Sequence, residues 1–431
     1  FAKGEQETPT VRSWEDVITV FFKFFGASIF NLRLTSVIVT LVSFCLLFFL
    51  ANRLQGKYFA FITSLIFLTT PLVMIQSHMA LDNIMPIPFT ILWLLGILLF
   101  GKTDKLRYLV LAGVSLGVGF YSYKGMRAIV PVWATLTLIY LGSNLIKNPI
   151  SISVRKFKPL IIFSFSLLPF ALAIPILQLL YPGAVLGGTT VALVSWYEFV
   201  YPYLSSFDPT FLFVKGDATI YHSTGRHGMF LIASLPLFLV GIYQALSRGK
   251  FWILIVIVFF TTPLLFGLVG SVHRASRLMA IIPLYSLIAS LGVVWIWEQK
   301  HKNFNPKLIL ILVLVLVGFN YYDFLKYYWF TYPKFTLNVF GDMSNNESYK
   351  ILAQESKNRN LIPYISKDVY VSDGEHAHFY EAIYFDGKIQ QWQNDGGATP
   401  DWSILLSSRE VIEGMEKVEI KMPSYYLHIN P

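Results

Sequence analysis

Charged and histidine side chains gather at a few places between long apolar segments of this sequence. One such place is the stretch 76–83, which contains His78 and Asp82 and is followed by another apolar segment. A carboxylate there could act as a base or hold an acceptor group, and the imidazole could contact a phosphate. Because Asp is a favoured N-cap residue and Asp82 precedes an apolar segment, a helix cap is the alternative interpretation of Asp82.

Two further places carry closely spaced cations at the ends of apolar segments. Lys124 and Arg127 follow one segment, and Arg274 and Arg277 precede another. A charge near hydrocarbon is costly unless an anion or water compensates it, and a lipid phosphate is the expected anion. Contact of each long side chain with ordinary headgroups is the alternative. We predict a phosphate-binding set that consists of His78, Lys124, Arg127, Arg274 and Arg277.

A long connection at 182–227 is too polar to span a membrane and too aromatic to be free in water. Its aromatic residues suit a position at the membrane interface, where they would exclude water from a nearby site. The residues that we select from this loop are Trp196, Tyr197, Tyr201, Asp217 and His222. The spacing of its His and acidic residues matches no metal-ligand pattern, so we expect no zinc or other metal and no cofactor.

The elements that must position these residues are membrane helices. Of the 431 residues 55% are hydrophobic and 14% are charged, and the mean hydropathy of +0.56 exceeds what a soluble core requires. Stretches of roughly 17 to 23 residues have the length and composition of spans. We predict about ten such spans, at 30–50, 58–75, 84–101, 107–122, 127–143, 158–181, 228–246, 251–270, 275–297 and 306–321.

Lys and Arg concentrate in alternate loops, at 53–57, 102–107, 147–158, 248–250 and 300–307. The positive-inside rule makes these loops cytoplasmic and places both chain ends outside. A net charge of +9 suggests nucleic acid as a partner, but the cations lie in short runs between apolar segments, which is typical of membrane topology. We therefore expect membrane lipids and no nucleic acid as partners, and a multi-pass protein of the cell (inner) membrane.

The predicted fold class is mainly α, a polytopic transmembrane helical bundle with a small C-terminal α/β extracytoplasmic domain. We expect an amphipathic extracytoplasmic segment at 1–29, the helical domain at 30–330 and the soluble domain at 335–431. Within the last, 368–372 and 418–421 have strand-like patterns, and Ser407 with Glu410 forms a capping-box pattern that predicts a helix. Since the sequence opens on Phe1 without Met, we expect the natural chain to begin earlier.

Short motifs spread over residues 8 to 330 resemble those of the dolichyl-phosphate-mannose-protein mannosyltransferases and the related bacterial aminoarabinose transferases, which are glycosyltransferases of the GT-C class. The motifs that carry the resemblance lie at 25–28, 31–36, 69–71, 77–83, 111–117, 121–127, 207–213 and 216–223. Asp82 matches the second outer-loop acid of the family, whereas His78 stands where an Arg is common. The resemblance implies that the principal catalytic acid precedes Phe1.

The resemblance implies an enzyme that takes a sugar from a polyprenyl-phosphate donor and attaches it to a protein, lipid or glycan acceptor at the outer face of the membrane. Asp82 would be the catalytic residue of this chain, the cations would bind the donor phosphate, and the loop at 182–227 would cover the substrate. A secondary transporter or lipid flippase and a noncatalytic membrane scaffold are the alternatives. Polar residues concentrated at the outer helix ends argue against a transporter, whose sites lie near mid-membrane.

Overall fold

The computed structural model describes two compact units of the chain. The described residues are 13–143, 154–181, 185, 195–269, 274–299, 305–336, 342–373, 375–385, 389–392, 399–420, 422 and 425–431. One unit contains residues 29–328 together with the first 24, and the other contains residues 329–431 together with 25–28. The predicted N-terminal segment 1–29 lies partly outside the described residues, and its described part contains helix α1 (Ser13–Phe25).

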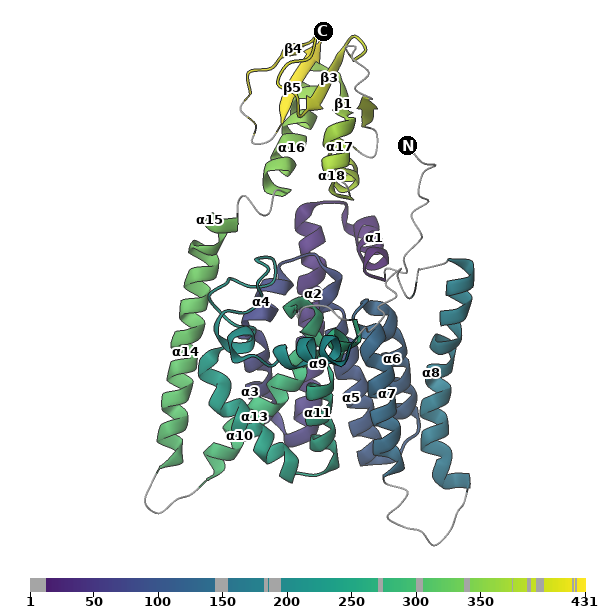
Figure 1. Cartoon of the computed structure of the whole chain (residues 1–431), viewed down its shortest axis with the longest axis vertical. Helices are drawn as coiled ribbons and strands as arrows, with labels where there is room; N and C mark the ends of the chain where they lie inside the picture. The colour runs from purple at the N-terminus through teal and green to yellow at the C-terminus, as the bar shows by residue number, and fades with distance from the viewer. Residues whose placement is uncertain are drawn as a thin grey trace. The chain divides into compact units, whose positions relative to one another are not determined.

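The first unit is a bundle of apolar helices (Figure 1), and helical residues occupy each of the ten predicted stretches. Its elements are α2 (Ile29–Gln55), α3 (Lys57–Leu68), α4 (Pro71–Ser77), η1 (Asp82–Ile84), α5 (Pro86–Thr103), α6 (Arg107–Ser122), α7 (Met126–Gly142), α8 (Val154–Leu180), α9 (Trp196–Ser205), η2 (Thr210–Val214), η3 (Ile232–Ser234), α10 (Leu235–Ser247), α11 (Lys250–Thr261), α12 (Leu264–Val269), η4 (Ala275–Ile281), α13 (Ile282–Glu298) and α14 (Pro306–Phe330).

Six helical segments among the described residues are long and apolar enough to cross a membrane, or seven if the bent pair α3 and α4 forms one span. The axes of α3 and α4 differ by 64°, and α7 and α10 are shorter apolar helices. Multiple membrane crossings are therefore confirmed, while the count of ten stays a prediction.

Glycines let the helices approach closely at two crossings. A Cβ at Gly113 of α6 would lie 1.7 Å from the Ser166 Oγ of α8. A Cβ at Gly241 of α10 would lie 1.9 Å from the Ile288 carbonyl oxygen, and one at Gly292 of α13 would lie 2.0 Å from the Leu237 carbonyl oxygen. Small residues that bring backbones into contact are the usual means of helix packing in membranes.

A buried aromatic pair packs α5 against α7. The rings of Trp93 and Trp133 stack with centroids 4.9 Å apart, and the Trp93 indole donates to Thr137.

Helices α8 and α14 lie on opposite flanks of the bundle in Figure 1, and only 6% and 11% of their apolar windows are buried. Apolar helices that expose so much surface are suited to contact with lipid tails.

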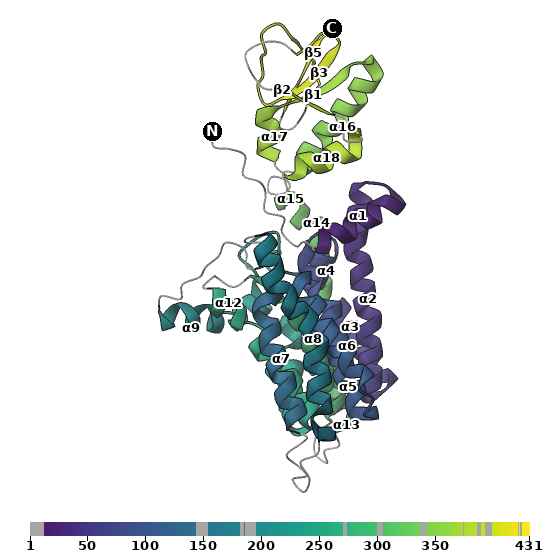
Figure 2. The ribbon, with the colours of Figure 1, turned by 90° about the vertical axis from the view of Figure 1, so that its right-hand side faces the viewer.

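Helix α9 lies across the direction of the bundle helices (Figure 2). Ser195 caps it, since the Ser195 Oγ accepts from the Glu198 N–H at 3.3 Å. Tyr203 faces the bundle and donates to the Phe260 carbonyl, while Trp196 and Tyr197 are 77% and 69% exposed. An amphipathic helix with exposed aromatic rings fits the predicted interfacial loop.

The second unit contains a small mixed sheet with helices, as predicted for the C-terminal domain. Its strand order is β2-β1-β3-β5-β4, with β1 parallel to β2 and β3, and β5 antiparallel to β3 and β4. Its elements are α15 (Tyr332–Thr336), α16 (Asp342–Arg359), β1 (Ile362–Ser366), α17 (Lys367–Asp373), α18 (Glu375–Phe385), β2 (Gln390–Trp392), β3 (Ser403–Ser407), β4 (Glu416–Lys417) and β5 (Tyr426–Asn430).

Two local predictions for this domain are wrong. Residues 368–372 form part of helix α17, because parallel strands β1 and β2 need a crossover connection and the chain between them supplies it. Ser407 ends strand β3 instead of opening a helix; its Oγ accepts from the Arg409 N–H at 3.1 Å, and Glu410 pairs with Lys417 at 2.8 Å. The strand-like segment 418–421 lies just after β4 and is not assigned to a strand in its described residues.

Candidate active site

Four segments that are distant in sequence meet at one end of the bundle. They are the turn from α4 into η1, the turn between α6 and α7, the loop from 215 to 227, and η4. Helices α5 and α7 start at this end and α6 finishes there, so short connections hold the polar residues against the ends of packed helices. Most of the residues selected from the sequence lie in these segments.

Asp82 is the first residue of η1 and is half-buried. The N-cap of η1 is Leu81 and that of α5 is Met85, so Asp82 is not the N-cap of either helix. Its carboxylate instead acts electrostatically on the side chains of Tyr123 and Arg127. The alternative interpretation as a helix cap is therefore not supported, and Asp82 lies in a cluster of functional groups.

Tyr123 connects Asp82 with η4. Its hydroxyl hydrogen bonds with the side chains of Ser276 and Arg277, and burial raises the pKa of Tyr123 to about 12, helped by the negative charge of Asp82. The hydroxyl therefore stays protonated at neutral pH and can donate a hydrogen bond. Sequence reasoning gave Tyr123 no role, because a single tyrosine at the end of an apolar segment is typical of any membrane interface.

Arg127, Arg274 and Arg277 belong to the same cluster. The Arg127 guanidinium donates to the Val185 carbonyl and interacts electrostatically with the Asp82 carboxylate. Arg274 and Arg277 both act electrostatically on His222. Arg127 thus lies near Asp82, Arg277 near Tyr123 and His222, and Arg274 near His222. Cations gathered in this way can hold a phosphate.

His222 is fixed by a chain of amide hydrogen bonds. The Asn83 amide donates to the Gln76 Oε1 at 2.7 Å, and the Gln76 Nε2 donates to the His222 Nδ1 at 3.3 Å. Burial lowers the pKa of His222, Asp217 opposes this shift, and the two arginines reinforce it, so the ring is neutral at pH 7. We did not select Gln76 and Asn83 from the sequence. Their only signal there was that they are polar and belong to the stretch 76–83, which contains Asp82.

Asp217 anchors η4 to the long loop. Its Oδ2 accepts from the Ala275 N–H at 2.5 Å and its Oδ1 accepts from the Thr219 N–H at 2.7 Å. The preceding Gly216 has φ +80°, and a Cβ there would lie 2.3 Å from the Ser223 Oγ. Only glycine fits this turn, which places the buried Asp217 against the start of η4 and near His222.

The other end of the same loop is held by α14. The Asp323 carboxylate accepts from Arg226 at 3.1 and 3.2 Å and lies 3.0 Å from the His227 Nε2. Burial lowers the pKa of His227, and its hydrogen bond to Asp323 opposes that shift. A small cavity of about 140 Å³ adjoins this clamp. The loop is thus fastened at both of its ends.

The remaining selected residues have other surroundings. The His78 Nδ1 donates to the Met74 carbonyl at 2.6 Å, and its ring lies 6.2 Å from that of Tyr328 on α14. Lys124 is exposed at the turn between α6 and α7. Trp196, Tyr197 and Tyr201 lie on the exposed side of α9. Within the part of the chain that the structure describes, no group of three or more His, Cys, Asp or Glu side chains could hold a metal ion.

Comparisons with known proteins agree with this architecture. Residues 7–175 match the family described as dolichyl-phosphate-mannose-protein mannosyltransferase, and no curated protein matches the chain in sequence. The fold is similar to that of ArnT from Cupriavidus metallidurans in the apo state, with a TM-score of 0.56 and 12% identity over 97% of this chain and 87% of ArnT. It is also similar to the same ArnT bound to undecaprenyl phosphate, with a TM-score of 0.53, 12% identity and the same coverage.

The sequence match covers the segments that contain Asp82, Tyr123 and Arg127, and the fold likeness extends over nearly the whole chain. The resemblance to this class of glycosyltransferases is thereby confirmed, as is the mainly helical fold with a small C-terminal sheet. The chain is a multi-pass membrane protein with an ArnT-like fold, and its residues 7–175 match the dolichyl-phosphate-mannose-protein mannosyltransferase family.

Proposed function

We propose that this protein transfers a sugar from a polyprenyl-phosphate donor to a protein, lipid or glycan acceptor at the outer face of the cell membrane. The observation that carries the proposal is the cluster in which Asp82, Tyr123 and the guanidiniums of Arg127 and Arg277 meet. In a transfer from a phosphate, a carboxylate can take the proton of the acceptor, and the cations beside it can stabilise the leaving phosphate. The solved ArnT complex with undecaprenyl phosphate supports a lipid phosphate as the ligand class.

In the proposed reaction the acceptor hydroxyl oxygen attacks the anomeric carbon of the sugar, and its proton passes to the Asp82 carboxylate. The bond between the anomeric carbon and the phosphate oxygen breaks, and its electron pair remains on the phosphate. Arg127, Arg274 and Arg277 stabilise the added negative charge, and the protonated Tyr123 hydroxyl donates a further hydrogen bond. The polyprenyl tail stays in hydrocarbon beside the helices.

We assign the cluster and the C-terminal unit to the extracytoplasmic side. The support is the charge of the loops at the opposite helix ends, where Lys102, Lys105 and Arg107 join α5 to α6. The exposed rings of Trp196, Tyr197 and Tyr201 would place α9 in the headgroup layer near the cluster. His78 and Lys124 are assigned to the headgroup side of the donor, outside the central phosphate contacts.

The test uses the full-length protein in vesicles with a radiolabelled polyprenyl-phosphate sugar and a membrane fraction as acceptor source. Asp82→Asn should lower the transfer rate about a hundredfold or more, because it removes the base. The matched control is Glu298→Gln, an acid at the opposite end of α13 that pairs with Arg248. Equal rates for the wild type and Asp82→Asn would refute the catalytic role. Movement of the donor across the bilayer without label transfer would instead identify a flippase.

A further inference from the structure

A buried glutamine connects the end of α4 with the loop that carries His222. Gln76 is fully buried, and its side chain hydrogen bonds with three groups from other parts of the chain. Its Nε2 donates to the Tyr221 carbonyl at 3.4 Å and lies 3.3 Å from the His222 Nδ1. Its Oε1 lies 2.7 Å from the Asn83 Nδ2. The direction of these hydrogen bonds determines which proton the His222 ring carries.

The Tyr221 carbonyl decides which way the Gln76 amide faces. A carbonyl oxygen can only accept, so the Gln76 atom beside it must be the Nε2, which donates. The Gln76 Oε1 then faces Asn83, and it needs a donor there because two amide oxygens at 2.7 Å would repel each other. The Asn83 Nδ2 is that donor. The buried Asn83 Oδ1 accordingly faces elsewhere and has no hydrogen-bond partner among the residues that the structure describes.

The same reasoning fixes the tautomer of His222. Because the Gln76 Nε2 is a donor, the His222 Nδ1 must accept, and the single proton of the neutral ring is on Nε2. The charged groups that act on the ring are Asp217, Arg274 and Arg277. Burial and the two arginines lower the pKa of His222, and Asp217 opposes this shift only in part. His222 therefore presents a neutral N–H group on the side of the ring that faces away from Gln76.

The His222 Nε2–H is available to a ligand. His222 is half-buried, and no side chain in the described parts of the chain accepts a hydrogen bond from its Nε2. Asp217 acts on the ring through its charge, while its two carboxylate oxygens accept from the N–H groups of Ala275 and Thr219. The neighbouring arginines carry only donors. An anion that these arginines attract would supply the missing acceptor.

We propose that the His222 Nε2–H donates to an oxygen of the donor phosphate, and that Gln76 and Asn83 are positioning residues that fix its tautomer. The identity of the ligand rests on the proposed sugar transfer. The phosphate then receives charged hydrogen bonds from arginines and one neutral hydrogen bond from His222, whose direction the buried amides set. Since its Nε2 already carries a proton, His222 is not the base that takes the acceptor proton.

Nitrogen NMR of the full chain in detergent, with isotope-labelled histidine, tests the tautomer without any sugar transfer. The signal of His222 is identified by its loss in His222→Gln. In the wild type at about pH 8 the Nδ1 should be unprotonated and the Nε2 protonated. Addition of a short-chain polyprenyl phosphate should shift the Nε2–H signal. A protonated Nδ1 in the wild type, or an Nε2–H signal that the polyprenyl phosphate does not move, would overturn the proposal.

Gln76→Glu tests the positioning role with nearly the same side-chain shape. At about pH 8 the new carboxyl group is ionised and can only accept, so the His222 Nδ1 should become protonated and donate to it. His227 is an internal reference, because its ring hydrogen bonds with Thr224 and Asp323 and its signal should not change. A His222 Nδ1 that stays unprotonated in Gln76→Glu would show that Gln76 does not set the tautomer.

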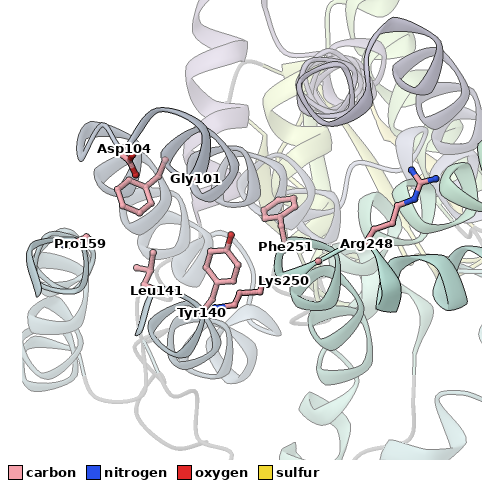
Figure 3. A pocket seen from close by; sticks show the side chains of 10 residues that line it. Gly101, Asp104, Tyr140, Leu141, Pro159, Arg248, Lys250 and Phe251 are labelled. Carbon is pink, nitrogen blue, oxygen red and sulfur yellow. The ribbon is translucent and has the colours of Figure 1, made fainter. Parts of the chain in front are cut away.

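The matched control makes the same substitution at another buried glutamine. Gln244 lies one helical turn before Arg248, which lines a cavity of about 610 Å³ at the other end of the bundle (Figure 3). Gln244→Glu should leave the His222 signal as it is in the wild type. An equal change of that signal in Gln244→Glu would contradict a direct effect of Gln76.

Affinity measurements distinguish a hydrogen bond from the filling of space. His222→Leu should weaken binding of the polyprenyl phosphate about tenfold, the effect of one hydrogen bond. His222→Gln should recover most of this loss, because an amide N–H can replace the imidazole N–H but cannot act as a base. Thermal unfolding in detergent checks that both variants fold. Equal losses in the two variants, or no loss in His222→Leu, would refute the hydrogen bond. If all these results hold while sugar transfer fails, the phosphate site stands and only the proposed reaction is wrong.

Discussion

Replacing Arg277 by Gln isolates the contribution of one guanidinium to donor binding. Arg277 hydrogen bonds with Tyr123 and acts electrostatically on His222, so it connects the two halves of the candidate active site. Gln keeps much of the side-chain length and can still hydrogen bond with Tyr123, but it removes the positive charge. The substitution therefore tests the interaction with a phosphate more than the packing of η4.

The expected loss follows from the charge-assisted hydrogen bond that Arg277 makes to the phosphate. Such a bond contributes about 1.5 to 3 kcal/mol, which corresponds to a roughly ten- to 150-fold weaker affinity. Arg277 is half-buried beside the buried Ser276, where water screens the charge less than at an exposed site. We therefore expect the loss to exceed that of an exposed cation such as Lys124.

The assay is a calorimetric titration of purified wild type, Arg277→Gln and Lys124→Gln with a short-chain polyprenyl phosphate. Lys124→Gln is the matched control, because Lys124 is exposed at the neighbouring turn and should change the affinity less than threefold, or by about 0.6 kcal/mol. Thermal unfolding of each variant in detergent confirms that the fold is kept. Unchanged affinity in Arg277→Gln, or an equal loss in both variants, would refute the placement of the phosphate.

Three other outcomes are expected. Gly241→Ala should lower the unfolding temperature, because the new Cβ would lie 1.9 Å from the Ile288 carbonyl oxygen and overpacking costs about 1 to 3 kcal/mol. Gly318→Ala is the control and should leave the unfolding temperature unchanged, because a Cβ at Gly318 would have no atom within 4 Å. The pKa of folded His222 lies below 6.5, so the unfolded chain takes up the proton first as the pH drops. The stability of the wild type should therefore fall from pH 6.5 toward the lowered pKa. The unfolding temperature of His222→Gln should decline less steeply over the same pH range. Protease added to intact spheroplasts should release residues 335–431, and cleavage only after lysis would reverse the proposed orientation.

The membrane helices were predictable from the sequence because apolar composition over a span is a local property. Each predicted stretch, from 30–50 to 306–321, contains helical residues, since a backbone in hydrocarbon must satisfy its own hydrogen bonds within the helix. The lengths of the membrane helices could be predicted less well from the sequence. In the structure α7 and α10 are short, and the axes of α3 and α4 differ by 64°. Such breaks depend on what packs against each helix.

The C-terminal domain shows where local pattern was insufficient. An α/β domain was predicted from alternating and helical patterns, and a sheet with helices is present. The segment 368–372 has a strand-like sequence but forms α17, because β1 already occupies the neighbouring sheet position and its parallel partner β2 requires a crossover. Which apolar segment pairs and which crosses over is decided by the sheet as a whole.

The sequence alone determined the candidates for the site, namely polar residues at helix ends where the membrane makes them costly, such as Asp82, Arg127 and Arg277. Only the tertiary structure decided which of them meet. Arg127 reaches Asp82 whereas Lys124, three residues away, is exposed. The physical reason is that contacts between Tyr123 and η4 depend on the packing of distant helices, which no local pattern records.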